Sequence, residues 1–180
     1  MELKKINNPN SKDFRDFWKI YVESFPEHER TTKKERKKKL KKQVYTLYGA
    51  FKNKNLVGFI DKWDLGGFIF IGYFAVKKEK RGKGFGTKLF QNFLKKTNKK
   101  IILEVEKPKN KTNKKRIKFY KNLGFKTNEY NYKMPPLKKG ERPLPLCLMS
   151  YPEKLSKKEF EKVRNKIHTI AYELDEPIKN

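Results

Sequence analysis

Apolar positions along this chain follow two different periods, and each period predicts one kind of element. From Phe14 to Phe25 they recur at steps of three and four residues, which predicts an amphipathic helix that Ser11 caps and Pro26 ends. Residues 44–77 are instead rich in aromatic and β-branched side chains and are divided by two turn-forming segments. We interpret them as an antiparallel meander of three strands.

The middle of the chain alternates between strand and helix patterns. The run that ends at Val76 predicts a strand, residues 89–94 carry a helical stripe, and Ile101–Val105 is a compact apolar segment typical of a buried strand. Strand, helix and strand in this order form a βαβ unit, so we expect its two strands to be parallel. A further helix is predicted around Ile117–Leu123, and Gly124 should end it in a left-handed conformation.

Two more helices carry start signals. Thr32 is spaced from Glu35 as in a capping box, and Ser156 from Glu159 in the same way. The final helix should present an apolar face as far as Leu174. A chain of 180 residues suits a single domain, and we expect a core at about 45–125 with a C-terminal strand and helix at 143–174 packed on it.

The charge balance is strongly basic. Lys and Arg number 47 against 20 Asp and Glu, which gives a formal net charge of +27, and eight of the ten residues at 33–42 are basic. This charge indicates either a polyanion-binding surface or a solvated lysine coat. We favour the coat because only seven of the basic residues are Arg, the side chain best suited to bidentate recognition of phosphates and bases.

Several kinds of chemistry are not expected. Cys147 is the one cysteine, which excludes an intramolecular disulfide and a cysteine-based metal cluster, and we expect it to be a buried apolar residue. His28 and His168 are too isolated to suggest a metal, so none is predicted. The sequence contains no apolar run of membrane-spanning length and no secretory leader, so we expect a cytoplasmic protein with no membrane association.

A glycine-containing loop, Arg81-Gly82-Lys83-Gly84-Phe85-Gly86, joins the strand that ends at Val76 to the helix after it. Such a loop exposes backbone N–H groups at the positive end of the helix dipole, where a phosphate can bind. Three alternating glycines also make ordinary turns, so the loop alone leaves both interpretations open.

Two segments together resemble the GNAT acetyltransferases, which use acetyl-coenzyme A. Tyr73–Val76 followed by the glycine loop resembles the pyrophosphate loop of that superfamily, and Arg116–Phe125 is similar to its later helix that ends in Tyr-x-x-x-Gly-Phe. The resemblance implies an α/β fold with a mixed, mostly antiparallel central sheet and helices on both faces. It also implies a βαβ cofactor site where the sheet splays open at the end of the strand at 68–77.

The resemblance further implies how acetyl-coenzyme A binds. The pantetheine arm would pair with the backbone near Phe74 and Val76, and the pyrophosphate would lie on the amides of the glycine loop. An asparagine that contacts the cofactor in the acetyltransferases of ribosomal-protein N-termini matches Asn113. The implied cofactor-binding residues are Phe74, Ala75, Val76, Arg81, Gly82, Lys83, Gly84, Phe85, Gly86, Thr87 and Asn113.

Two residues are candidates for the chemistry. Tyr120 matches the tyrosine of the second motif and would act as general acid for the departing thiolate, although a core aromatic residue is the alternative. Phe70 stands where histone-type members have a glutamate, whereas Glu104 resembles the glutamate of the ribosomal-protein group and would act as base. A surface charge at a strand end is the alternative for Glu104, with a water chain removing the proton.

Acidic residues suggest how an acceptor would be attracted. Glu27, Glu29 and Asp61 would draw a cationic amine toward an acceptor cleft in an otherwise basic chain. The expected activity is therefore N-acetylation of a small-molecule or protein amine by a monomer or homodimer. The competing hypothesis is a non-catalytic module that binds coenzyme A and docks on nucleic acid or ribosomes through the basic run at 33–42.

Overall fold

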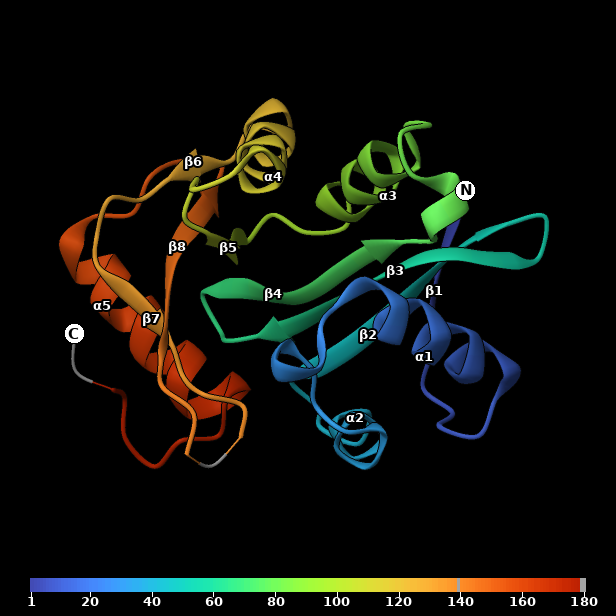
Figure 1. The fold of residues 1–180 in the computed structure, drawn as a ribbon, viewed down its shortest axis with the longest axis horizontal. Helices are drawn as coiled ribbons and strands as arrows, with labels where there is room; N and C mark the ends of the chain where they lie inside the picture. Colours follow the sequence, from blue (N-terminus) through green and yellow to red (C-terminus); the bar gives the residue numbers. More distant parts are fainter. Residues whose placement is uncertain (139, 179–180) are drawn as a thin grey trace. The chain divides into compact units, whose positions relative to one another are not determined.

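The computed structural model describes residues 1–138 and 140–178. Runs of strands are separated by helices along the chain (Figure 1). The elements are β1 (Glu2–Lys5), α1 (Lys12–Ser24), the 3-10 turn η1 (Glu27–Glu29), α2 (Lys33–Lys39), β2 (Tyr45–Lys52), β3 (Asn55–Asp64), β4 (Phe68–Val76), the 3-10 turn η2 (Lys78–Lys80), α3 (Phe85–Leu94), β5 (Lys100–Glu106), α4 (Lys111–Asn122), β6 (Lys126–Thr127), β7 (Tyr132–Met134), β8 (Leu144–Tyr151), α5 (Lys157–Lys166) and the π turn η3 (Ile167–Ala171).

The chain divides into two compact units. The first holds residues 1–63 and 72–98, and the second holds residues 64–71 and those from Lys99 onward. Strand β4 therefore belongs to both units, its first half to the second unit and its second half to the first. Within the described residues the strand order is β1-β2-β3-β4-β5-β8-β6, and β7 also pairs with β8.

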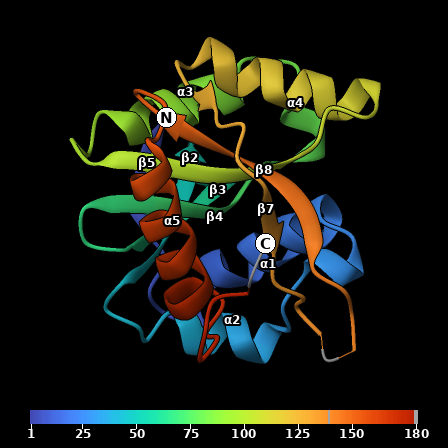
Figure 2. The same ribbon diagram turned by 90° about the vertical axis from the view of Figure 1, so that its left-hand side faces the viewer.

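In the first unit, β2 pairs antiparallel with β1 and with β3. Figures 1 and 2 show α1 and α2 on one side of these strands and α3 on the other. The predicted helix at 14–25 is confirmed as α1, because the Ser11 hydroxyl accepts from the Phe14 amide at 3.1 Å and Phe25 is the C-cap. Its Phe17 ring packs edge-on against Phe59 of β3, with 4.7 Å between centroids, which fixes the helix to the sheet.

In the second unit, β4 pairs parallel with β5, and the described ladder runs from Phe68 opposite Lys100 to Ile71 opposite Leu103. The predicted βαβ unit is thereby confirmed. Strand β8 pairs antiparallel with β5, β6 and β7, so the sheet is mixed and mostly antiparallel, as predicted. Figures 1 and 2 show α4 on one face of β5 and β8 and α5 on the other.

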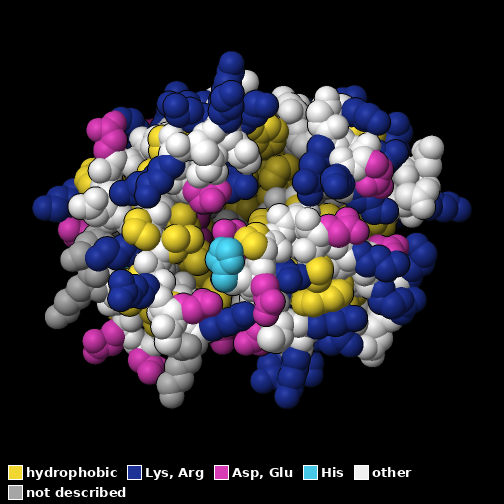
Figure 3. Space-filling view, in the orientation of Figure 1, with side chains coloured by type: hydrophobic (Ala, Val, Ile, Leu, Met, Phe, Trp, Pro, Cys, Tyr) yellow, Lys and Arg dark blue, Asp and Glu magenta, His cyan; other side chains and the backbone are white. Residues whose placement is uncertain are grey.

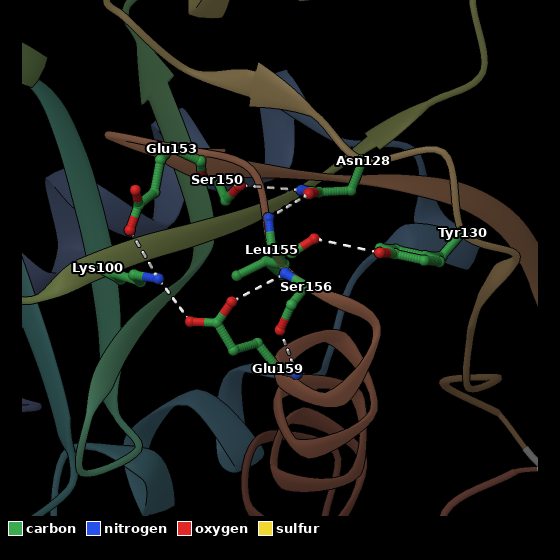
Figure 4. Close-up of polar contacts among 8 residues, drawn as sticks. All are labelled: Lys100, Asn128, Tyr130, Ser150, Glu153, Leu155, Ser156 and Glu159. Atoms are coloured by element: carbon green, nitrogen blue, oxygen red, sulfur yellow. Dashed lines mark hydrogen bonds and ion pairs between the residues drawn. The ribbon is translucent and has the colours of Figure 1, made fainter.

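The start of α5 is fixed to the sheet by polar contacts (Figure 4). The predicted capping box of Ser156 and Glu159 is confirmed. Lys100 of β5 forms ion pairs with Glu153 at 2.9 Å and with Glu159 at 2.5 Å. The Asn128 side chain accepts from the Leu155 amide at 2.8 Å, so both sides of the helix start are anchored.

The end of α5 differs from the sequence-based prediction. An α-helical stripe was expected as far as Leu174, but α5 ends at Lys166 and a π turn follows. The turn is closed by the Tyr172 amide donating to the Ile167 carbonyl at 3.0 Å. Strands β6 and β7 were not predicted either, because segments of two and three residues carry too little periodic pattern.

On the one face drawn in Figure 3, charged side chains do not gather into a single patch. Figure 3 shows Lys and Arg distributed over the visible face, with acidic and apolar side chains between them. Among the described helices, none has the length and apolar character needed to span a membrane.

Candidate active site

The glycine loop leads into α3 with two left-handed residues. Gly82 has a φ of +72° and Gly84, the N-cap of α3, has a φ of +74°. Within the described chain no side chain caps this helix, and its first turn holds no acidic residue. A Cβ on either glycine would meet no atom within 4 Å. The first-turn N–H groups are therefore left without a side-chain cap at the positive end of the helix dipole, as an anion site requires.

The remaining loop residues lie beside this helix start. Gly86 is helical, so its φ does not demand glycine as those of Gly82 and Gly84 do. Of the predicted cofactor residues, Arg81 and Lys83 lie in the turn before α3. Phe85, Gly86 and Thr87 lie in the first turn of the helix.

Arg81 holds the loop to its own framework. Its Nε donates to the Val76 carbonyl at 3.0 Å, and its terminal nitrogen donates to the Ser24 hydroxyl at 2.9 Å. One side chain thus joins the end of β4 to the last residue of α1. The sequence resemblance implied a backbone role for Arg81 in the loop, and the structure adds this side-chain role.

The end of β4 is closely packed against β3. Ala75 and Val76 are buried, and the Phe74 ring lies edge-on to Phe90 of α3 at 5.1 Å. A Cβ on Gly58 would lie 2.7 Å from the Ala75 carbonyl oxygen, so only glycine allows this approach.

Gly84→Val should abolish tight binding of acetyl-coenzyme A in a calorimetric titration. Valine at a left-handed φ also strains the backbone by about 1–2 kcal/mol, so a second variant is needed to separate strain from bulk. Gly84→Asn serves this purpose, because asparagine tolerates the left-handed region. Both variants should bind weakly, and wild-type affinity in Gly84→Asn would contradict an obstructed phosphate site.

The first unit contains a buried ion pair that the sequence analysis missed. Asp61 on β3 is fully buried and accepts from Arg36 of α2 at 2.7 Å and from the Tyr45 hydroxyl at 3.1 Å through the same oxygen. Its other oxygen accepts from the Tyr73 amide at 2.8 Å. The Arg36 guanidinium lies between the rings of Tyr21 and Tyr73, 4.5 and 4.2 Å from their centroids. The ion pair and all of these partners belong to the first unit.

This ion pair corrects two expectations. Asp61 was predicted to attract the acceptor, but its carboxylate is enclosed by protein donors and has no exposed surface. The basic residues, those at 33–42 included, were interpreted as a solvated coat, but Arg36 on α2 is buried. Three lysines of α2 also lie over aromatic rings: Lys33 over Trp18, Lys37 over Phe14 and Lys39 over Trp63.

The other two predicted acceptor residues are nearer the surface. Glu27 is exposed and Glu29 is half-buried, both on η1. The Tyr73 hydroxyl donates to the Glu29 carbonyl at 2.6 Å, which ties this turn to β4.

Glu104 is the most unusual carboxylate of the second unit. It lies on β5 and is half-buried, and each of its oxygens accepts from one phenol. Tyr132 of β7 donates to Oε1, and Tyr172 donates to Oε2 at 2.6 Å. Burial raises the pKa of Glu104 to about 7, against the opposing effect of the two hydroxyls. The group can therefore accept or release a proton near neutral pH.

His168 of the π turn lies beside both tyrosines, 5.5 Å from the Tyr132 ring and 6.5 Å from the Tyr172 ring between centroids. It is fully buried, and its Nε2 lies 3.1 Å from the Lys133 carbonyl. Burial lowers the pKa of His168 to about 4, so it is neutral at pH 7. Its Nδ1 is buried without a hydrogen-bond partner in the described chain.

Tyr120 and Asn113 both lie on the buried face of α4. Burial raises the pKa of Tyr120 to about 12, so its phenol keeps its proton at neutral pH. Asn113 donates from its side chain to the Lys107 carbonyl at 3.1 Å, which holds the segment before α4. Helix α4, which carries both residues, lies on the face of β5 and β8 opposite α5 (Figure 2).

Cys147 on β8 is half-exposed rather than buried as predicted. Its pKa is raised, chiefly by burial, so the thiol is a weak nucleophile near neutral pH. Residues 1–138 and 140–178 contain no cluster of histidine, cysteine and acidic residues able to hold a metal ion.

Known proteins resemble this chain in structure and in sequence. A solved structure described as a candidate GNAT-family acetyltransferase from Bacteroides thetaiotaomicron is 28% identical, covers 97% of this chain and 100% of its own, and superposes with a TM-score of 0.92. The Bacillus subtilis (strain 168) protein YjbC, named as a candidate acetyltransferase, is 46% identical over 61 residues. That alignment covers 33% of this chain and 31% of YjbC, so the chain matches about a third of that relative.

More distant structures share the fold. The ribosomal-protein-S18-alanine N-acetyltransferase of Escherichia coli is 17% identical over 86% of this chain and 95% of its own, with a TM-score of 0.62. The sequence profile of the acetyltransferase (GNAT) family matches residues 14–125, which include the glycine loop, Glu104 and Tyr120. This chain therefore belongs to the GNAT family of acetyltransferases.

Proposed function

We propose that this acetyltransferase moves an acetyl group directly from acetyl-coenzyme A to a primary amine. The family assignment gives the reaction class, and the observation that supports the mechanism is Glu104, a carboxylate with a pKa near 7 held by two phenols. Because the family match at 14–125 draws on both compact units, we also propose that the two units act as one acetyltransferase domain.

The residues at the start of α3 suit coenzyme A. Two left-handed glycines, uncapped first-turn amides and the absence of an acidic residue in that turn are all favourable to a pyrophosphate. The thioester supplies the acetyl group and a good leaving group. The chain's own part is to bind the pyrophosphate, to orient the thioester and to move two protons.

Glu104 and Tyr120 would move these protons. The amine nitrogen bonds to the thioester carbon, the carbon–sulfur bond breaks, and the nitrogen loses its proton to a Glu104 oxygen. Tyr120 donates to the departing sulfur, which suits a phenol whose pKa of about 12 keeps it protonated. Direct transfer is favoured over an acyl-enzyme because the pKa of Cys147 is raised.

The acceptor class is a primary amine, and Glu27 and Glu29 are proposed to attract its positive charge. Solved structures of this fold at 17–18% identity are named as spermidine, ribosomal-protein-S18-alanine and aminoglycoside 6'-N-acetyltransferases. Since one fold hosts several acceptors, the proposal is tested by a thiol-release screen with polyamines, aminoglycosides, amino acids and peptide N-termini. Failure to release thiol with every amine would contradict it.

Tyr120→Phe should lower kcat for the best acceptor roughly 10²-fold, because the leaving sulfur loses its proton donor. The KM for acetyl-coenzyme A should change little, since the ring and its packing on Phe125 are kept. Tyr151→Phe is the matched control, because Tyr151 also packs on Phe125, at 5.5 Å. Equal losses in both variants would assign Tyr120 to the core rather than to the reaction.

A further inference from the structure

The π turn after α5 determines on which side of the helix axis Tyr172 lies. In a continuous α-helix, a residue five positions after Ile167 lies about 140° around the axis from it. In the π turn the Tyr172 amide donates to the Ile167 carbonyl, so Tyr172 stands one turn above Ile167. Ile167 is fully buried, and Tyr172 is therefore carried to the sheet side, where its ring lies 6.4 Å from that of Phe70 of β4.

The start of the same helix leaves it little freedom to rotate. Glu159 is bound by Lys100 of β5 (Figure 4), and burial of Phe160 and Val163 fixes the following turn. The position of the Tyr172 hydroxyl is thus set by packing along the whole of α5.

Resting on the acetyl transfer proposed above, we propose that Tyr172 and Tyr132 are positioning residues. They hold the Glu104 carboxylate in place as the proton acceptor for the incoming amine, and the π turn aims Tyr172 at it. One phenol on each oxygen fixes the plane of the carboxylate and leaves one lone pair of each oxygen for the amine.

The surroundings of Glu104 support this assignment. The titratable and charged groups that face the cluster are Tyr132 from β7, His168 from the π turn, Tyr172 directly after it, and Arg164 from α5. His168 is neutral and hydrogen-bonded to a backbone carbonyl, and Arg164 acts on Tyr132 and His168 rather than directly on Glu104. The two hydroxyls are therefore the groups that stabilise the Glu104 anion.

Removing either hydroxyl should make Glu104 harder to ionise. The acid limb of the pH profile of kcat/KM should move up by about one pH unit in Tyr172→Phe and in Tyr132→Phe, because each loses a hydrogen bond to a charged group. Tyr130→Phe is the matched control, since its hydroxyl donates to the Leu155 carbonyl at 3.3 Å and not to Glu104. Its profile should not move.

A measurement without substrate separates this inference from the proposed function. The Glu104 carboxyl is titrated by ¹³C NMR in protein labelled at glutamate, with Glu104→Gln used to assign its signal. An upward shift in the two phenylalanine variants and none in Tyr130→Phe supports the positioning role even if no acceptor is found. Unshifted carboxyl titrations in both variants overturn it. A shifted carboxyl titration with an unmoved activity profile overturns the role of Glu104 as base.

Discussion

Asp61→Asn is expected to lower the free energy of unfolding by about 3–5 kcal/mol, because it leaves the charge of Arg36 buried without its counter-ion. Arg36 has 1% of its side chain exposed and Asp61 none, so water cannot replace the lost partner. The substitution keeps the size of the side chain, and no cavity accompanies the loss of charge. Urea-induced unfolding of the purified variant measures the effect.

The matched control is Asp64→Asn. Asp64 also pairs with a basic residue, Lys99, at 2.8 Å, but their side chains are 33% and 43% exposed. An exposed pair of this kind contributes about 0–1 kcal/mol. The double variant Arg36→Met/Asp61→Asn should recover part of the stability lost in Asp61→Asn. A loss below 1 kcal/mol for Asp61→Asn would show that the buried pair is not a main support of the first unit.

Glu104→Gln is expected to lower kcat/KM by roughly 10²–10⁴-fold with the best acceptor, since an amide cannot accept the amine proton. The amide can still bind both tyrosines, by accepting through its oxygen and donating through its nitrogen. Activity is measured by thiol release across pH. Retention of most activity would assign proton removal to water or to another group.

The same variant should be more stable than wild type at alkaline pH. The pKa of Glu104 is raised to about 7 in the folded protein, so the charged form is favoured in the unfolded chain. In the wild type, the contribution of Glu104 to the free energy of unfolding is therefore fully present below its pKa in the unfolded chain, near 4.5. This contribution is lost as the pH rises through about 7, its pKa in the folded protein. Glu104→Gln should gain up to about 3 kcal/mol at pH 8 and almost nothing at pH 4.5.

Local signals in the sequence predicted most of the elements. The caps at Ser11, Thr32 and Ser156 satisfy backbone groups within three residues, and such contacts can be recognised from spacing alone. Gly124, with a φ of +97°, ends α4 as expected. The parallel pairing of β4 and β5 also follows from the order of elements, because a helical crossover returns the chain in the same direction.

Contacts between distant residues were not predictable in the same way. Arg36 and Asp61 are 25 positions apart, and although Arg36 is the one arginine among the lysines at 33–42, spacing along the chain does not reveal its partner. Tyr172 was missed because an α-helical period places it away from the sheet, whereas the π turn brings it to Glu104. Tyr132 lies on a strand of three residues, too short for its pattern to be recognised.

Arg81 has a consequence for how quickly and how tightly the glycine loop can bind a ligand. Its guanidinium is held by the Val76 carbonyl and the Ser24 hydroxyl, so the loop has its shape before any ligand arrives. Binding of the proposed pyrophosphate would then carry little entropic cost from ordering the backbone, and more of the interaction would remain as affinity. Arg81 thus preorganises the loop. This effect would appear in the association rate of the ligand as well as in the affinity of the loop for it.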